Sequence, residues 1–338
     1  MLATSLLSLA TLAIFAAAHP GEVHQRLSER ELMIRKAAAH ERHLLARNCA
    51  PQISDFTARR KAKRDLARRN FEPRASSLTA TAANPYYTAL QNTTCVTAPE
   101  VTEGPYYINN ELVRQDLTED QSGIQLVLDI GVLDTTTCEP LSNAFVEIWA
   151  ANATGFYGSY GAMSGGPPVE RRQGPGGPGG GAGGGSQVMA RNETFLRGGL
   201  ATDDAGITEL ITIYPGYYTG RTAHIHTMVH LNWETSANGT LVSHAGSLVH
   251  IGQFFFDEDW NDQIYAIDPY TTTTQSRTYN EEDSILQEEN SNGNSAYVGL
   301  ELLGSDLSGG LLGYITVGVD STASYTIMNT NYLNSTGA

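Results

Sequence analysis

The sequence predicts a mainly β protein: an antiparallel β-sandwich core with a helical N-terminal arm and long loops. From about residue 96 onward, short strand-like apolar runs are separated by turns rich in Gly, Asn, Asp and Thr, a pattern typical of sandwiches and barrels. Before residue 76 the chain is instead rich in Ala, Leu, Arg and Glu, which favour helix. No glycine-rich phosphate-binding pattern follows a predicted strand, so a nucleotide-binding α/β fold is not supported.

The first 75 residues divide into two segments. Residues 1–18 form a short apolar run that ends in three alanines, which predicts a secretory signal peptide cleaved after Ala18 and a secreted, extracellular protein. Residues 19–75 are predicted to be a basic helical arm. The dibasic pairs Arg59-Arg60, Lys63-Arg64 and Arg68-Arg69 could allow a secretory-pathway protease to remove residues 19–69 as a propeptide. The alternative is an arm that packs on the domain or on a partner subunit. Packing on a partner subunit would imply a homodimer.

Residues 76–338 are predicted to form one β-sandwich domain. A Gly- and Pro-rich segment at 161–186 cannot bury a core, so it is predicted to be a loop that interrupts the domain without dividing it. Runs such as Ala144-Phe-Val-Glu-Ile-Trp149 alternate as strand residues do. The predicted strands are 124–133, 144–149, 207–213, 223–231, 248–256, 296–302 and 311–319.

Charge is distributed unevenly along the chain. The segment from Glu22 to Arg74 holds 14 of the 21 Lys and Arg residues but 7 of the 36 Asp and Glu residues, which leaves 7 basic and 29 acidic residues elsewhere. An acidic body repels nucleic acid and anionic membrane surfaces, so neither is an expected partner. Beyond the signal peptide no segment approaches ~18 consecutive apolar residues, which argues against a membrane span.

Three cysteines allow at most one intramolecular disulfide. Cys95 and Cys138 both fall in the predicted domain, so they are predicted to pair. Cys49 is then expected to leave with the arm or to bridge to another chain. Asn-x-Ser/Thr sequons fit a glycosylated secreted protein; they lie at Asn92, Asn152, Asn192, Asn238 and Asn334.

The run Tyr214-Pro-Gly-Tyr-Tyr-Thr-Gly-Arg-Thr-Ala-His-Ile-His226 concentrates groups that can do chemistry. His224 and His226 alternate as strand residues do, so their imidazoles leave the same face of a sheet and can bind one metal ion. The Pro-Gly pair predicts a turn that brings Tyr218 back toward the same point, where Arg221 adds a fixed positive charge. A metal, a phenol and a guanidinium at one point indicate chemistry on an electron-rich or anionic substrate.

The residues alone leave the remaining metal ligands open. No Asp or Glu adjoins the His-x-His pair and the cysteines are too few for a thiolate site, whereas 16 tyrosines are present. A tyrosinate ligand needs a cation that pulls a phenol far below its usual pKa of about 10. Ferric iron does this more readily than zinc or copper(II), so tyrosine ligation would indicate Fe(III). Any single tyrosine is explained at least as well by a place in the core or a loop, and His230 and His250 are expected to be core or surface residues.

Several spaced motifs together resemble those of the intradiol ring-cleavage dioxygenase family. In chain order they are Thr102-Glu-Gly-Pro-Tyr-Tyr107, Trp149-Ala-Ala-Asn-Ala-Thr-Gly-Phe-Tyr157, Arg197-Gly-Gly-Leu-Ala-Thr-Asp-Asp-Ala-Gly206, the Tyr214–His226 run and Gln253-Phe-Phe-Phe. With the signal peptide and the Gly-rich insert, the chain looks most like the secreted fungal branch of that family.

The resemblance implies a mononuclear non-haem Fe(III) held by two tyrosines and two histidines. The implied ligands are Tyr157, Tyr218, His224 and His226. Tyr160 is the rival for the first tyrosine, but Tyr157 closes the Trp-x-x-Asn-x-x-Gly-x-Tyr run. Tyr217 is the rival for the second, but Tyr218 ends Pro-Gly-x-Tyr.

The resemblance also implies a reaction. Catechol-type substrates would be cleaved with O2 between the two hydroxylated carbons to give cis,cis-muconate-type products. Arg221 matches the arginine that steadies negative charge on the substrate ring, and Gln253 matches a glutamine near the substrate. Tyr218 is expected to leave the metal and take a substrate proton.

Three other functions compete with this one. A non-catalytic secreted β-sandwich module could bind carbohydrate or cell wall, but the chain keeps all four implied ligands and Arg221. Cleavage after Ala18 would expose His19 as an N-terminal copper ligand, but a proline follows it and no partner histidine is suggested by spacing. A zinc hydrolase built on the His-x-His pair would lack an evident third ligand and general base.

Overall fold

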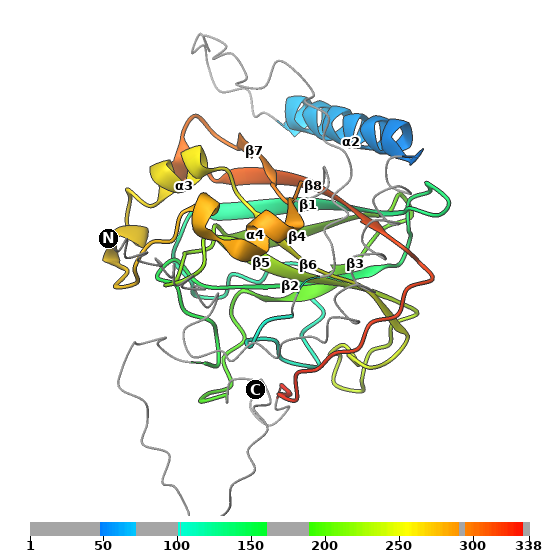
Figure 1. Ribbon diagram of the computed structural model, residues 1–338. Helices are drawn as coiled ribbons and strands as arrows, with labels where there is room; N and C mark the ends of the chain where they lie inside the picture. Colours follow the sequence, from blue (N-terminus) through cyan, green and yellow to red (C-terminus); the bar gives the residue numbers. More distant parts are fainter. Residues whose placement is uncertain (1–47, 72–100, 102, 161–188, 291–294, 334–338) are drawn as a thin grey trace, which may run out of the picture.

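The computed structural model describes residues 48–71, 101, 103–160, 189–290 and 295–333. The predicted signal peptide at 1–18, the arm before residue 48, Cys95 and the Gly-rich loop at 161–186 lie outside these residues. The described chain forms two four-stranded sheets packed face to face, with few helices (Figure 1). The predicted β-sandwich is therefore confirmed.

Sheet one consists of strands from both ends of the domain. In spatial order it contains β4 (Ile207–Ile213), β1 (Gln125–Asp134), β8 (Leu311–Val319) and β7 (Gly299–Leu302). The pairs β1–β4 and β7–β8 are antiparallel, but β1 and β8 run parallel over nine residue pairs. This pair departs from the predicted antiparallel arrangement, because the first and last strands are not joined by a hairpin and can pair in either direction.

Sheet two is antiparallel throughout and carries the predicted chemical groups. In spatial order it contains β3 (Arg197–Ala201), β2 (Phe145–Ala150), β5 (His224–Leu231) and β6 (Ser247–Phe255). The sequence did not predict β3, because Arg-Gly-Gly-Leu-Ala has little strand propensity. It becomes a strand by pairing with β2 at the sheet edge.

The main core lies between the two sheets. Alternate residues of β1, such as Leu128 and Ile130, meet Ile225 and Val229 of β5 in one buried cluster. Since successive strand residues point to opposite faces, His226 and Met228, which alternate with Ile225 and Val229, face away from this core. A second buried cluster, which includes Met228 and Trp149, covers that outer face of sheet two.

Short helices fill the connections after β6 and β7. They are α3 (Glu258–Ile264), η1 (Tyr270–Thr272), η2 (Asn280–Glu282), α4 (Ser284–Glu289) and η4 (Leu307–Gly309). The sequence prediction contained none of them, because each is too short for a periodic pattern. Within the described parts of the chain, no helix has the length and apolarity needed to cross a bilayer.

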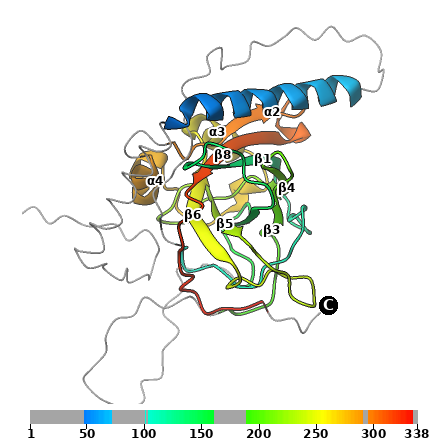
Figure 2. The ribbon, with the colours of Figure 1, turned by 90° about the vertical axis from the view of Figure 1, so that its right-hand side faces the viewer.

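The helix α2 (Ala50–Phe71) lies across the outer face of sheet one (Figures 1 and 2). Arg60 is buried, and its Nε donates a hydrogen bond to Asp129 Oδ1 of β1 at 2.8 Å, while Nη1 donates to Thr316 Oγ1 of β8 at 2.9 Å. Lys61 pairs with Glu301 of β7. A protease that cleaved between Arg59 and Arg60 would first have to displace the Arg60 guanidinium from its hydrogen bonds to β1 and β8.

A disulfide joins Cys49, just before α2, to Cys138 in the turn after β1. The predicted pairing of Cys95 with Cys138 is therefore wrong, and Cys49 does not bridge to another chain. The prediction failed because it assigned Cys49 to a separable arm, whereas α2 packs on sheet one and brings that cysteine to the end of β1. The disulfide closes a loop of 89 residues in sequence.

Replacing Arg60 by Ala should lower the free energy of unfolding by about 3 kcal/mol, because Asp129 would stay buried without its counter-charge. The matched control is Arg59→Ala. The Arg59 side chain is 79% exposed and pairs with Asp55 one turn earlier, so this change should cost less than about 0.5 kcal/mol. Urea unfolding measures both, and equal losses would show that α2 does not depend on the buried pair.

Candidate active site

Two histidines of β5 lie on the outer face of sheet two. His224 and His226 flank Ile225, whose side chain is in the sandwich core. His226 stacks on Trp149 of β2, with ring centroids 4.9 Å apart and planes 6° from parallel. A Cβ on Gly104 would lie 2.9 Å from His226 Cε1, so the loop at 103–107 packs directly on this imidazole. Both histidines are buried.

The tautomer of His224 follows from its backbone contact. Its Nδ1 lies 2.7 Å from the carbonyl oxygen of Thr222. A carbonyl oxygen can only accept a hydrogen bond, so Nδ1 carries the proton and Nε2 presents its lone pair. This arrangement is the usual one for a metal-binding imidazole, whose other nitrogen donates to a backbone carbonyl.

The two predicted tyrosines meet at that lone pair. The hydroxyl oxygen of Tyr157 lies 3.2 Å from His224 Nε2, and that of Tyr218 lies 3.4 Å from the same atom. Both side chains are buried, and the two phenol rings are 5.9 Å apart. The Tyr157 ring also lies 6.1 Å from the His226 ring. The structure thus brings together all four residues predicted as ligands.

The rival tyrosines point elsewhere. The hydroxyl of Tyr160 donates to the Tyr107 carbonyl at 2.9 Å and accepts from Asn331 Nδ2 at 3.0 Å. Tyr217 is half-buried and packs edge-on against Tyr265. Neither hydroxyl contacts the histidines.

Two glycines allow the two tyrosine loops to touch. Gly155 has a φ of +86°, and a Cβ there would lie 2.3 Å from the carbonyl oxygen of Tyr217. A Cβ on Gly216 would lie 2.4 Å from the carbonyl oxygen of Asn152. Both clashes are with backbone atoms of the opposite loop, so a side chain at either position would push the loops apart.

A buried guanidinium lies beside the phenols. Arg221 follows Tyr218 by a turn in which its backbone N–H donates to the Tyr218 carbonyl at 2.9 Å. Its Nε donates to Asp283 Oδ2 at 2.8 Å, and its Nη2 donates to Gln253 Oε1. Two buried donor atoms, Arg221 Nη1 and Gln253 Nε2, have no hydrogen-bond partner among the described residues. Buried donors normally have partners. Others, such as Trp149 Nε1 and Arg197 Nε, also lack one there, but the Arg221 and Gln253 side chains adjoin each other beside the phenols, where one bound acceptor could satisfy both.

The two buried phenols can ionise near neutral pH only if a cation binds beside them. Burial raises the pKa of both Tyr157 and Tyr218 well above the usual value, and the charge of Arg221 only partly opposes this. Both phenols therefore stay neutral near pH 7 unless a nearby cation stabilises the phenolates. Among the described residues no three His, Cys, Asp or Glu side chains could hold a metal together, so a metal here would need the phenol oxygens. Two phenols and two imidazoles fit a hard, strongly charged cation.

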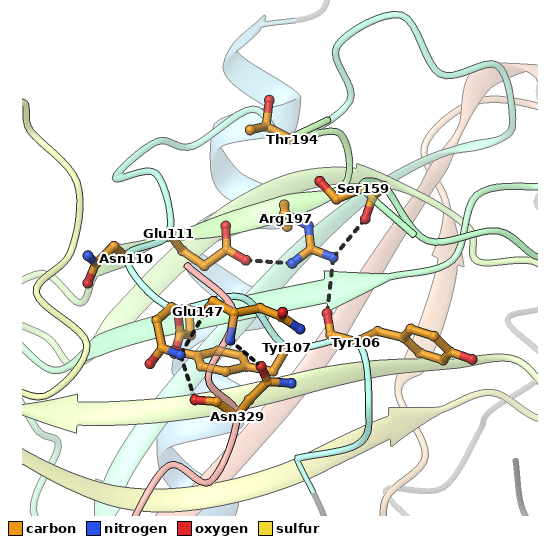
Figure 3. Close-up of polar contacts among 12 residues, drawn as sticks. Tyr106, Tyr107, Asn110, Glu111, Glu147, Ser159, Thr194, Arg197 and Asn329 are labelled. Atoms are coloured by element: carbon orange, nitrogen blue, oxygen red, sulfur yellow. Dashed lines mark hydrogen bonds and ion pairs between the residues drawn. The ribbon is translucent and has the colours of Figure 1, made fainter. Parts of the chain in front are cut away.

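A polar network beside the site holds its loops to sheet two (Figure 3). Arg197 of β3 is buried and donates from Nη1 to Glu111 at 2.7 Å and from Nη2 to the Tyr106 carbonyl at 3.2 Å. The Nη2 group also lies 3.4 Å from the Gly158 carbonyl, next to Tyr157. One guanidinium thus joins the loops on either side of the phenols.

The outer face of β5 carries a further buried histidine. His230 Nε2 donates to Glu147 at 2.7 Å, and Tyr107 donates its hydroxyl to the same carboxylate at 2.9 Å. The prediction that His230 is a core or surface residue fits this arrangement, since its ring is buried in a hydrogen-bonded position. Sequence reasoning missed Glu111, Glu147 and Asp283. Each is a single acidic residue that belongs to no recognisable sequence motif. Its role becomes evident only from the buried basic side chain that it contacts in the folded protein.

Gly155→Ala should destabilise the protein by about 2 kcal/mol more than Gly239→Ala, because only the first introduces a steric clash. The two glycines have nearly the same φ, +86° and +83°, but the added Cβ at Gly239 would meet no atom within 4 Å. Both changes carry the backbone cost of about 1–2 kcal/mol, and only Gly155→Ala adds the clash between loops. Thermal or urea unfolding of both variants measures the difference, and equal costs would mean that the loops do not need this close approach.

Comparison with known proteins identifies the family. No protein-family model and no curated protein matches the chain. Among solved structures, the chain is similar to an intradiol ring-cleavage dioxygenase from Tetranychus urticae, with 30% identity over 68% of this chain and 98% of that one and a TM-score of 0.53. A second dioxygenase structure matches with 30% identity over 68% of this chain and 97% of that one and a TM-score of 0.52.

The shared part extends over nearly the whole length of both relatives and over two thirds of this chain. At that coverage and identity, the chain belongs to the intradiol ring-cleavage dioxygenase family.

Proposed function

We propose that this protein is a secreted non-haem Fe(III) dioxygenase. It would cleave catechol-type aromatic diols with O2 between the two hydroxylated carbons and form cis,cis-muconate-type products. One observation carries the proposal: the hydroxyls of Tyr157 and Tyr218 both lie within 3.4 Å of His224 Nε2, in a buried region beside His226.

The donor set supports iron in the ferric state. Tyr157, Tyr218, His224 and His226 would hold the ion. When bound, Fe(III) would supply the charge that stabilises phenolates and a deprotonated catechol, and would draw electron density from the ring so that O2 can react with it. The Thr222 carbonyl keeps the proton of His224 on Nδ1, so Nε2 is available as a ligand atom.

The chain's own groups would handle protons and charge. A catechol must lose two hydroxyl protons to become a dianion, and the Tyr218 oxygen can accept one of them. Arg221 Nη1 and Gln253 Nε2 are buried donors without described partners, and they would bind the negative charge that develops on the substrate ring. Donors fixed in a site shielded from water stabilise such charge without reorganising, which is commonly worth about 3 kcal/mol per donor.

Secretion is supported by two features. The apolar run at 1–18 predicts a signal peptide. The disulfide between Cys49 and Cys138 suits an oxidising compartment.

The four proposed ligands are tested by colour. Protein from iron-replete expression should be red-brown, because tyrosinate bound to Fe(III) absorbs visible light. Tyr157→Phe and Tyr218→Phe should each lose most of this absorption and of the iron, while the neighbouring changes Tyr160→Phe and Tyr217→Phe should keep both. Visible spectra and metal analysis give the answer. A colourless, iron-free wild-type protein would instead favour a binding module.

The role of Arg221 is tested by Arg221→Lys, which keeps a positive charge beside Asp283 but lacks the planar set of donors. The variant should keep its iron and colour, while kcat for catechol should fall about 100-fold. Arg191→Ala serves as the control, since Arg191 is largely exposed and pairs with Glu193 on the surface. An unchanged kcat in Arg221→Lys would remove this residue from the proposed mechanism.

A further inference from the structure

Asp283 comes from the connection between β6 and β7, outside every motif that the sequence offers. Its side chain is fully buried. One carboxylate oxygen, Oδ2, accepts from Arg221 Nε at 2.8 Å and from the backbone N–H of Thr222 at 3.0 Å. The other, Oδ1, accepts from the backbone N–H groups of Ile285 and Leu286 and so caps α4. This carboxylate therefore joins α4 to the turn that carries Arg221.

The contacts of Asp283 determine how the guanidinium lies. A guanidinium is planar, so fixing two of its nitrogens fixes the third. Asp283 holds Nε, Gln253 holds Nη2, and the Phe255 ring lies 5.9 Å from the guanidinium carbon. What remains is Nη1, buried and without a partner among the described residues. The negative charge of Asp283 also counteracts the burial of Arg221 and raises its pKa, so the cation persists.

We infer that Asp283 is a positioning residue for the proposed ring cleavage: it holds Arg221 so that Nη1 faces the bound diol. The inference rests on the proposed function. Among the described residues, the hydrogen bonds of the Asp283 carboxylate go to Arg221 and to backbone N–H groups, and none goes to a phenol or an imidazole of the proposed metal site. Asp283 therefore acts through Arg221. Its removal would leave the iron in place but would free the guanidinium to rotate away from the substrate.

A neighbouring residue provides a matched control. Asn280 is also buried and comes from the same connection, and its Oδ1 accepts from Thr222 Oγ1 at 2.7 Å. Asn280 thus supports the same turn as Asp283 without a contact to Arg221. A loss that is caused only by loosening the turn should appear in both Asn280→Ser and Asp283→Asn.

The experiment uses the full-length iron-loaded enzyme with catechol as substrate. Asp283→Asn keeps an oxygen to cap α4 but turns an amide group toward two N–H donors, and Asp283→Ser keeps the cap without reaching Arg221. Both variants should retain the iron and the visible absorption of the wild type. Their kcat should fall about 10- to 100-fold, as for other residues that orient a reacting group, while KM changes little. Asn280→Ser should keep most of its kcat.

A double-mutant cycle shows whether the effect passes through Arg221. If it does, Asp283→Asn should lower kcat little further in the Arg221→Lys background, because residues that act as a unit are not additive. Additive losses, an unchanged kcat in Asp283→Asn, or an equal loss in Asn280→Ser would overturn the inference. Loss of colour or of folded protein in both Asp283 variants would also overturn it, since Asp283 would then support the fold or the metal site.

The wild-type enzyme separates this inference from the proposed function. A wild type that binds iron but does not cleave catechols would overturn the proposed function, and this inference with it. A wild type that cleaves catechol, with Asp283 variants that are equally fast, would overturn the inference alone.

Discussion

The site depends on the alternation of β5 between two environments. Ile225 and Val229 point into the sandwich core, so His224 and His226 must leave the opposite face of sheet two. Two imidazoles on that face could lie in water. Here the loops that carry the site tyrosines cover both rings. A buried imidazole nitrogen costs free energy unless it has a hydrogen-bond partner or binds a metal. The strand period fixes the direction of the histidines, and the loops decide what they meet.

Three buried ion pairs between arginine and a carboxylate hold distant segments of the molecule together. Arg60 with Asp129 seats α2 on sheet one, Arg197 with Glu111 joins the loops at 103–111 and 157–160 to β3, and Arg221 with Asp283 joins α4 to the turn before β5. Their partners are 69, 86 and 62 residues apart in sequence. Burying such charges costs desolvation energy, so these pairs contribute more to a unique geometry than to net stability.

Arg60 in the arm and Arg221 in the site are both buried guanidiniums paired with a carboxylate, but their roles differ. In the arm, every donor of the Arg60 guanidinium points to β1 or β8, as suits a residue that only holds two elements together. In the site, Arg221 is held by two partners and keeps Nη1 without one among the described residues. Burial is equally complete in both, and what distinguishes them is whether the surroundings satisfy all the donors. The Arg197 guanidinium also has one nitrogen, Nε, that is unsatisfied within the described part of the chain, so the feature that indicates a ligand at Arg221 is an unsatisfied donor beside the two phenols.

Elements with a local signal could be predicted from the residues alone. The strands at 207–213 and 311–319 were predicted with the bounds that the structure has, and β5 and β6 within one residue at each end, because alternation is a property of neighbouring residues. The tyrosine and histidine motifs also predicted the four side chains that lie together. Only the fold distinguishes Tyr157 from Tyr160, because the Tyr157 hydroxyl lies next to His224 and the Tyr160 hydroxyl donates to a backbone carbonyl. Only the folded arrangement shows that β3 forms, that β1 and β8 run parallel, that Cys49 pairs with Cys138, and that Asp283 holds Arg221. Each of these is a pairing between segments far apart in the chain, and such a pairing depends on where the folded layers bring them, which no short window of residues records.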